Sequence, residues 1–328
     1  MWVRNPFTGA LTYFTDVHKK GSGFARRGQS PPASQPPDWE AAEAARMTEL
    51  EAAQRDCPFC PGNESLTTAE LMRVTADEVG HGISTDAPWL VRAFRNLFPR
   101  IPEACTGGRN ESYVVVEDPR HFADGARHHD ELLYTALLPR PQFRAIIRAD
   151  VAVARVAYQN SAVSAVLLRK NQGRESGASQ PHLHNQVIGC DQPFPPVAVE
   201  RAALAREPGL WREILAFVED EGFLVAARDG GLLYFCPFGV FPRSYEVVCP
   251  DAVGRITELP EAVLDLFADL LHEALTILGP LPLDYEVHDG PGIPLHAHIC
   301  ARHFPYSNIG GTLNLPADLA ITLRPPRP

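Results

Sequence analysis

The strongest constraint on the fold is an internal repeat. The segment "SYVVVEDP" (112–119) has a counterpart in "SYEVVCPD" (244–251), and each is followed by a helical segment and then by a histidine-bearing strand. These strands, "PHLHNQV" (181–187) and "PLHAHIC" (294–300), stand at matching places near the ends of the two halves. Because these short matches keep the same order, we interpret the chain as two copies of one unit.

Hydrophobic periodicity indicates what each unit contains. In the first half, residues 112–118 and 164–170 have the composition of strands, and the apolar spacing of residues 143–159 predicts a helix between them. In the second half, residues 261–278 predict the corresponding helix. Two copies of an antiparallel sheet with a covering helix give an α+β fold, with the two sheets joined.

The composition disfavours several classes of function. With 40 acidic and 30 basic side chains the net charge is −10, which disfavours an extended nucleic-acid surface but permits a basic pocket for one phosphorylated ligand. No apolar run in residues 1–20 is long enough for a signal peptide, and no segment reaches the ~20 apolar residues of a membrane helix. We therefore expect a cytoplasmic protein that binds neither nucleic acid nor membrane.

The segment "SGASQPHLHNQVIG" (176–189) places three polar side chains on one face of a strand. Side chains alternate between the two faces, so His182, His184 and Gln186 project together while Leu183 points the other way. Three polar groups on one face, after a run of small residues, indicate a site.

The cysteines favour metal chemistry over disulfides. Seven is an odd count, and only Cys57 and Cys60 are closely spaced. A redox pair would need its first cysteine at a helix N-terminus, and Pro61 and Gly62 directly after the motif disfavour that helix. A tight turn would instead direct two thiolates at one zinc ion, with two further ligands from elsewhere in the chain. A redox pair or plain buried thiols remain the alternative.

Five motifs together resemble the galactose-1-phosphate uridylyltransferase family of the histidine triad superfamily. They occur in order along most of the chain: "RNPFTG" (4–9), "CPFCPGNE" (57–64), "FRNLFPR" (94–100), "VVVEDPRH" (114–121) and "KNQGRESGASQPHLHNQ" (170–186). The resemblance implies duplicated histidine-triad-like units with antiparallel sheets and covering helices, an N-terminal unit of residues 1–190 and a C-terminal unit of residues 191–328. Related branches include nucleotide-sugar phosphorylases and dinucleoside-polyphosphate phosphorylases.

The resemblance also implies the chemistry of the histidine strand. It assigns His184 as nucleophile and Gln186 as its partner, and it assigns zinc to Cys57, Cys60, His121 and His182. Taken alone, His121 reads as a surface histidine after a turn, and His128 and His129 are less well placed alternatives. A neutral imidazole can attack the α-phosphorus of a nucleoside diphosphate compound. An amide donates hydrogen bonds but cannot act as a general acid, so Gln186 favours transfer over hydrolysis.

Further positions follow from the same resemblance. Residues that approach the nucleotide phosphates are Asn171, Gly173, Gly177 and Ser179, and a base and ribose pocket is matched by Phe94, Asn96 and Phe98. Core packing is an equally adequate role for the two phenylalanines. A second zinc or iron site is matched by Glu200, His288, His296 and His298. The alternative for Glu200 is a carboxylate on the surface of a helix.

Two segments depart from the family pattern. "HKKGSG" (18–23) stands where the family usually has arginines for the nucleotide, leaving Lys19, Lys20, Arg26 and Arg27 as candidate substitutes. "SNIGGTLNLPAD" (307–318) lacks the elements that contact the hexose in galactose-1-phosphate enzymes. The identity of the sugar therefore stays open.

Three functions fit these observations. The first is a nucleotidyltransferase that carries a nucleoside monophosphate from a nucleotide sugar or similar donor to a phosphorylated acceptor through nucleotidyl-His184, as a monomer or a homodimer. The second is a phosphorylase that uses inorganic phosphate as the acceptor. The third is a catalytically silent, zinc-stabilised protein that binds nucleotide without forming a covalent adduct.

Overall fold

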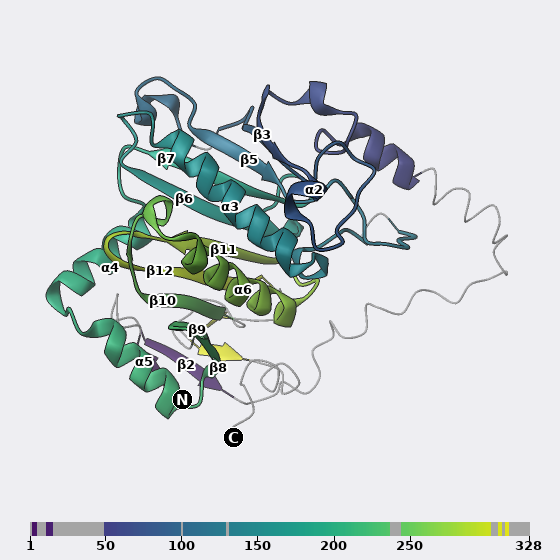
Figure 1. Ribbon diagram of the computed structural model, residues 1–328. Coiled ribbons are helices and arrows are strands. Elements are labelled where there is room, and N and C mark those ends of the chain that lie inside the picture. Colours follow the sequence, from purple (N-terminus) through teal and green to yellow (C-terminus); the bar gives the residue numbers. More distant parts are fainter. Residues whose placement is uncertain are drawn as a thin grey trace, which may run out of the picture.

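The computed structural model describes residues 2–4, 11–15, 49–99, 101–128, 131–236, 244–302, 308–309 and 312–314. Within them a ten-stranded sheet forms the centre of the molecule, and all of its strand pairs are antiparallel (Figure 1). In spatial order its strands are β3 (Glu70–Val74), β4 (Val91–Arg95), β5 (Ser112–Val116), β7 (His184–Cys190), β6 (Ala165–Gln172), β11 (Leu283–His288), β12 (Gly290–Ala301), β10 (Ser244–Gly254), β9 (Gly231–Phe235) and β8 (Leu224–Arg228).

The helices and a second, smaller sheet surround this centre. The helices are α2 (Ala76–Val79), α3 (Arg140–Ala157), α4 (Pro195–Arg206), α5 (Leu210–Asp220) and α6 (Glu261–Leu278), and residues 49–56 are also helical. The smaller sheet has the order β1 (Trp2–Arg4), β2 (Leu11–Thr15), β14 (Thr312–Asn314) and β13 (Asn308–Ile309). In the part of the chain that the structure describes, we find no helix with the length and apolar character needed to span a bilayer.

The order of the ten strands shows the duplication directly. Read outward from the central β6–β11 pair, the strands of the two halves follow the same order. In each half, one long helix lies between the third and fourth strands of the unit along the chain. Val116 pairs with His184 in the first half as Val248 pairs with His296 in the second. The predicted α+β fold of duplicated antiparallel units is therefore confirmed. The division at residue 190 falls between β7 and α4 and stays a prediction.

The cross-strand register gives a different correspondence between the two histidine strands from the one that the shared H-x-H pattern suggests. Because Val116 and Val248 are equivalent, His184 corresponds to His296, and Gln186, two residues further, corresponds to His298. The histidine pair of the first half is thus displaced by two residues relative to that of the second. Only the pairing of distant strands reveals this displacement, because the sequence pattern H-x-H is the same in both halves.

The helices α3 and α6 cover one face of the sheet, side by side (Figure 1). Each follows a proline in extended conformation, Pro139 or Pro260, which begins the helix without needing a backbone donor. Their apolar faces are fully buried against the sheet, as at Ile146 and Phe267. The helices also exchange ion pairs, one of which joins Arg144 and Asp269 at 2.6 Å.

Alternation along the strands separates this helix-covered core from a polar face. Asn185 on β7 points toward α3 and donates to Asp150 at 2.7 Å. The neighbouring His184 and Gln186 therefore project from the opposite face. There they adjoin a second apolar cluster made of Cys57, Phe59, Cys60, Trp89, Phe94, Val114 and Val116.

Candidate functional site

Two cysteines and two histidines converge beside the first histidine strand. Cys57 and Cys60 lie in the turn after the helical residues 49–56. His121 follows β5, and His182 lies two residues before the start of β7. The Cys60 Sγ atom lies 3.4 Å from His121 Nδ1 and 3.5 Å from His182 Nδ1, and Cys57 Sγ lies 3.7 Å from His182 Nδ1. Tetrahedral ligands of zinc lie roughly 3.3 to 3.8 Å apart at ordinary bond lengths. These four residues therefore fit a metal ion.

The local sequence explains the turn that carries the cysteines. The Asn63 side chain donates to the backbone carbonyl oxygens of Gln54, Arg55 and Cys57 at 2.8 to 3.0 Å, closing the chain on itself. Cys57 therefore follows the C-terminal end of a helix, where the macrodipole does not favour a thiolate. This position disfavours the redox alternative. The hydrogen bond from the Cys60 thiol holds the pKa of Cys57 well below its usual range, so a thiolate ligand is available.

A backbone carbonyl sets the orientation of His182. The Nε2 atom of His182 lies 2.8 Å from the carbonyl oxygen of Asp118, so Nε2–H donates and Nδ1 faces the cysteines. The ring is fully buried. Of the alternatives, His128 is exposed and outside the cluster, and His129 lies outside the described residues, as do Lys19, Lys20, Arg26 and Arg27.

A hydrogen bond to a backbone carbonyl oxygen also fixes the tautomer of His184. Its Nδ1 atom lies 2.8 Å from the carbonyl oxygen of His182, so Nδ1–H donates and the Nε2 lone pair is left for chemistry. Burial lowers the pKa of His184 to about 4. The imidazole is therefore neutral at pH 7 and able to act as a nucleophile. The Phe59 ring packs edge-on against it, with 5.2 Å between ring centroids.

Gln186 has a basic neighbour that the sequence did not single out. Arg169 on β6 pairs directly with Gln186 on β7, so both side chains lie on the same face as His184. Gln186 Oε1 and Arg169 Nε are buried and have no hydrogen-bond partner among the described residues. The Nη2 atom of Arg169 donates to Asn171 Oδ1 at 2.9 Å. A guanidinium beside His184 can bind phosphoryl oxygens. Only the β6–β7 register places it there.

The predicted phosphate-approach residues lie at the end of β6, where Asn171 is placed, and in the loop between β6 and β7. Gly173 and Gly177 have φ angles of 82° and 85°, which favour glycine, and a Cβ atom on Gly173 would lie 3.1 Å from Pro282. Asn171 donates to the Ser176 carbonyl oxygen, which holds the loop, whereas Ser179 is exposed. Asn171, Gly173 and His182 line a cavity of about 600 Å³, which His184 does not line.

The predicted base and ribose residues have different environments. Phe94 is buried against Phe59, with 5.6 Å between ring centroids, whereas Phe98 is 79% exposed. The Asn96 side chain accepts a hydrogen bond from the backbone N–H of Phe98 at 2.9 Å. Core packing therefore accounts for Phe94 but not for Phe98.

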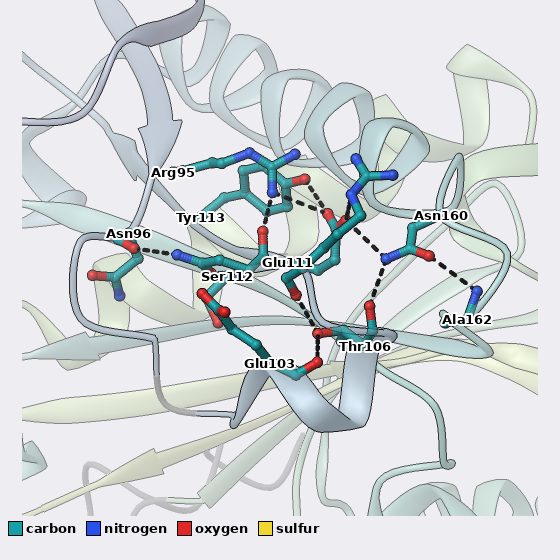
Figure 2. A network of polar contacts seen from close by, with 11 residues as sticks. Arg95, Asn96, Glu103, Thr106, Glu111, Ser112, Tyr113, Asn160 and Ala162 are labelled. Atoms are coloured by element: carbon teal, nitrogen blue, oxygen red, sulfur yellow. Dashed lines mark hydrogen bonds and ion pairs between the residues drawn. The ribbon is translucent and has the colours of Figure 1, made fainter.

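The loop that carries Asn96 and Phe98 is tied to the domain by a buried carboxylate. Figure 2 shows Arg95, Tyr113 and Asn160 converging on Glu111, with Asn160 Nδ2 at 3.0 Å and Arg95 Nη1 at 3.4 Å from its carboxylate oxygens. This network fixes both ends of the loop between β4 and β5.

The structure brings together three of the four residues predicted for a second metal site. Glu200, from α4, lies 2.9 Å from His288 Nδ1 and 3.3 Å from His296 Nε2. Burial alone would raise the pKa of Glu200, but hydrogen bonds from His288 and His296 lower it to about 2. The Nε2 atom of His288 is buried without a hydrogen-bond partner among the described residues. This donor set fits zinc or iron.

His298 lies in a different group from these three. It is placed with Cys236 and Glu246, not with Glu200 and His288. The reason is the β10–β12 register, which sets His298 directly opposite Glu246. The structure thus groups His298 apart from the other three, and the assignment of all four residues to one metal ion stays a prediction.

The sheet topology gives this chain the fold of solved structures described as ADP-glucose phosphorylase, galt-like protein and uridylyltransferase. A structure of an ADP-glucose phosphorylase from Arabidopsis thaliana with bound ADP-glucose has a TM-score of 0.68 to this chain, at 19% identity, over 99% of this chain and 98% of that one. A uridylyltransferase mutant has a TM-score of 0.57, at 21% identity, over 82% and 88%. At these identities the likeness shows the fold.

Within that fold class, the chain belongs to the family described as Domain of unknown function (DUF4921), whose model matches residues 97–291. By sequence, an ADP-glucose phosphorylase from Arabidopsis thaliana is 27% identical over 146 residues, 40% of this chain. The match spans only 36% of that relative's length.

Proposed function

We propose that this protein transfers a nucleoside monophosphate from a nucleoside diphosphate compound to a phosphate-bearing acceptor, through a covalent bond to His184. The observation that carries the proposal is the presentation of a neutral His184 Nε2 atom beside Gln186 and Arg169. The donor class is suggested by the likeness to proteins described as uridylyltransferase and ADP-glucose phosphorylase. Nucleotide, or nucleotide sugar, and a phosphorylated acceptor are the proposed partners.

The two half-reactions balance on the same phosphorus atom. His184 Nε2 forms a bond to the α-phosphorus while the bond from that phosphorus to the bridging oxygen breaks, and the leaving group departs as a phosphate monoester. An oxygen of the acceptor phosphate then attacks the same phosphorus and releases His184. Nδ1–H keeps donating to the His182 carbonyl, which stabilises the cationic ring of the intermediate.

Two side chains beside His184 would stabilise the transferring group. The Gln186 amide N–H groups can donate to the phosphoryl oxygens, and the Arg169 guanidinium can neutralise the charge that grows on them. A phosphate monoester is a good leaving group and needs little general-acid help. The amide at Gln186 is therefore adequate where a hydrolase would use a third histidine.

Zinc is the metal we assign to Cys57, Cys60, His121 and His182, because two thiolates and two imidazoles at tetrahedral spacing suit it. A zinc ion bound there would hold the turn of residues 57–63 against β7. His182 would then present its carbonyl oxygen to His184 in a fixed position. The ligands form a closed set, so the role is structural.

The likeness to ADP-glucose phosphorylase favours inorganic phosphate as a second candidate acceptor. The chemistry at His184 is unchanged, because phosphate attacks the same phosphorus. The missing hexose-contacting elements in residues 307–318 agree with an acceptor that carries no sugar. Supplying either phosphate or a sugar phosphate after the covalent step separates the two candidates.

The test is the covalent intermediate. The full chain is incubated with UDP-glucose, ADP-glucose or diadenosine tetraphosphate without acceptor, and intact-protein mass spectrometry follows the mass. We expect a gain of one nucleoside monophosphate, labile in acid and stable in mild base, which the acceptor discharges. His184→Asn should abolish the adduct and retain zinc, whereas the exposed-histidine variant His128→Gln should form it normally. Turnover by His184→Asn at the wild-type rate would refute the mechanism and leave a direct-displacement role.

A further inference from the structure

A third cluster of metal-ligating side chains lies on the second half of the sheet. Cys236 follows β9, Glu246 is on β10 and His298 is on β12, and their ligand atoms all lie within 4.8 Å of one another. Cys236 and Glu246 are buried, with 3% and 6% of their surfaces exposed. Glu246 Oε2 lies 2.9 Å from His298 Nδ1.

The duplication locates this cluster relative to the nucleotidyl-transfer face. Glu246 corresponds to Val114, because each pairs with the equivalent aromatic residue, Tyr234 or Phe94. Cys236 lies two residues after Tyr234, and Asn96 lies two residues after Phe94, so Cys236 corresponds to Asn96. By the same register, His298 corresponds to Gln186. The second half thus has thiol, carboxylate and imidazole groups where the first half has an amide, an apolar side chain and an amide. All three side chains of the second half are of types that can bind a metal ion.

We propose that Cys236, Glu246 and His298 bind a divalent zinc ion, at a site separate from Glu200, His288 and His296. Thiolate, imidazole and carboxylate are the three ligand types that zinc takes in proteins, and a thiolate disfavours the harder magnesium or calcium. Cys300 lies two residues after His298 on the same strand face and also contacts its imidazole. Its thiol is not among the ligand atoms that lie within 4.8 Å of one another, so the cluster itself supplies three ligands.

Glu246 lies between the two clusters. Its Oε2 atom lies 2.9 Å from His298 Nδ1. Its Oε1 atom lies 3.8 Å from Nε2 of His296, which belongs to the cluster with Glu200. Each cluster retains its own set of donors, and one carboxylate adjoins both. Zinc at Cys236 would hold the end of β9 against β10 and β12 and keep His298 out of the Glu200 cluster.

The test is zinc content, measured by mass spectrometry on the full chain after purification with zinc and extensive dialysis. Cys236→Ser and His298→Gln should each lose about one zinc per chain. The double variant should lose no more than either single variant, because both remove the same site. Cys249→Ser is the matched control, since Cys249 is buried on β10 but lies on the opposite face, and its zinc content should equal that of the wild type.

Other outcomes overturn the proposal. Full zinc content in Cys236→Ser, or losses that add in the double variant, would place His298 in the Glu200 cluster. If the variants do not fold, crystals of the wild-type chain grown with zinc supply the answer. An anomalous difference peak at the zinc edge should lie between Cys236 Sγ and His298, and its absence there refutes the site. None of these readouts depends on nucleotidyl transfer, so either proposal can fail alone.

Discussion

At the scale of single residues, backbone carbonyls determine what the histidines can do. The Asp118 carbonyl directs His182 Nδ1 toward the cysteines, and the His182 carbonyl leaves His184 Nε2 free to react. The proposed zinc ligand His182 thus orients the proposed nucleophile His184 through its own main chain. A change at the metal cluster should therefore affect both stability and transfer.

The metal cluster can be tested by removing its thiolates. Cys57→Ser/Cys60→Ser should lose about one zinc per chain, because no other described thiol lies in this cluster. Structural zinc contributes of the order of 10 kcal/mol, so the melting temperature should fall by roughly 10 °C or more. Metal analysis and thermal unfolding measure the two effects. Cys190→Ser, which changes a partly exposed thiol elsewhere, is the control; full zinc content in the double variant would contradict the assignment.

Arg169 is expected to contribute through charge at the phosphoryl group. Arg169→Met should lower kcat/KM on the order of tenfold to a thousandfold, because one preorganised donor to the transferring group is lost. Arg169→Lys should restore part of the activity by restoring the charge. Arg155→Met, which removes an exposed arginine on the helix-covered side, should leave kinetics unchanged. Wild-type kcat/KM in Arg169→Met would show that the guanidinium serves only its contacts with Asn171 and Glu286.

At the scale of elements, the long helices anchor the sheet from behind the site. His272 on α6 donates from Nε2 to the Leu138 carbonyl oxygen at 2.9 Å, which joins the second helix to the segment before α3. The ring is buried, and burial lowers the pKa of His272 below its ordinary 6.5. The neutral ring is the form that the folded protein prefers.

This preference predicts a pH dependence of stability. Because the folded pKa is lowered, the unfolded chain binds the proton more tightly. The contribution of His272 is therefore complete above about pH 6.5 and is lost as the pH falls from there through the folded pKa. His272→Gln keeps a donor but does not titrate, so its free energy of unfolding should fall less than that of the wild type between pH 7.5 and 5.5.

Urea denaturation at the two pH values measures this difference. The exposed-histidine variant His128→Gln should retain the wild-type dependence. An identical loss in wild type and His272→Gln would mean that His272 has the same pKa in both states.

At the scale of the whole molecule, the two halves share one sheet and one helix layer. The β6–β11 pair joins them. Tyr285 of the second half also donates to Asn185 Oδ1 at 3.1 Å, and Asn185 is the residue next to His184 on β7. On the helix layer, Arg144–Asp269 and Arg148–Asp265 are related by the duplication. We expect the halves to unfold in one cooperative transition.

The ion pairs between the helices should contribute little energy despite their geometry. Arg144 is 40% exposed, and it donates to both carboxylate oxygens of Asp269. A double-mutant cycle with Arg144→Ala and Asp269→Ala should therefore give a coupling of about 0.5 to 1 kcal/mol, reduced at high salt. Urea unfolding with and without 1 M salt, a concentration at which the Debye length is about 3 Å, provides the measurement. A coupling independent of salt would point to packing instead of charge.

The sequence by itself determined the elements and the residue types of the site. Periodicity placed a helix at 261–278, the observed bounds of α6, because the buried stripe of a helix is a local pattern. It also identified the strand at 112–118, observed as β5 (Ser112–Val116), and the shared face of His184 and Gln186. The internal repeat indicated the duplication because both copies keep the same local order.

Only the tertiary structure decided which distant residues meet. The β6–β7 register places Arg169 beside Gln186, and the β10–β12 register draws His298 to Glu246 and away from Glu200. The resemblance proposed His121 as a ligand, but its approach to Cys60 depends on the loop after β5. Register is set by hydrogen bonds between strands far apart in the chain, and a shift of one residue would turn every side chain to the other face. No local pattern contains that information.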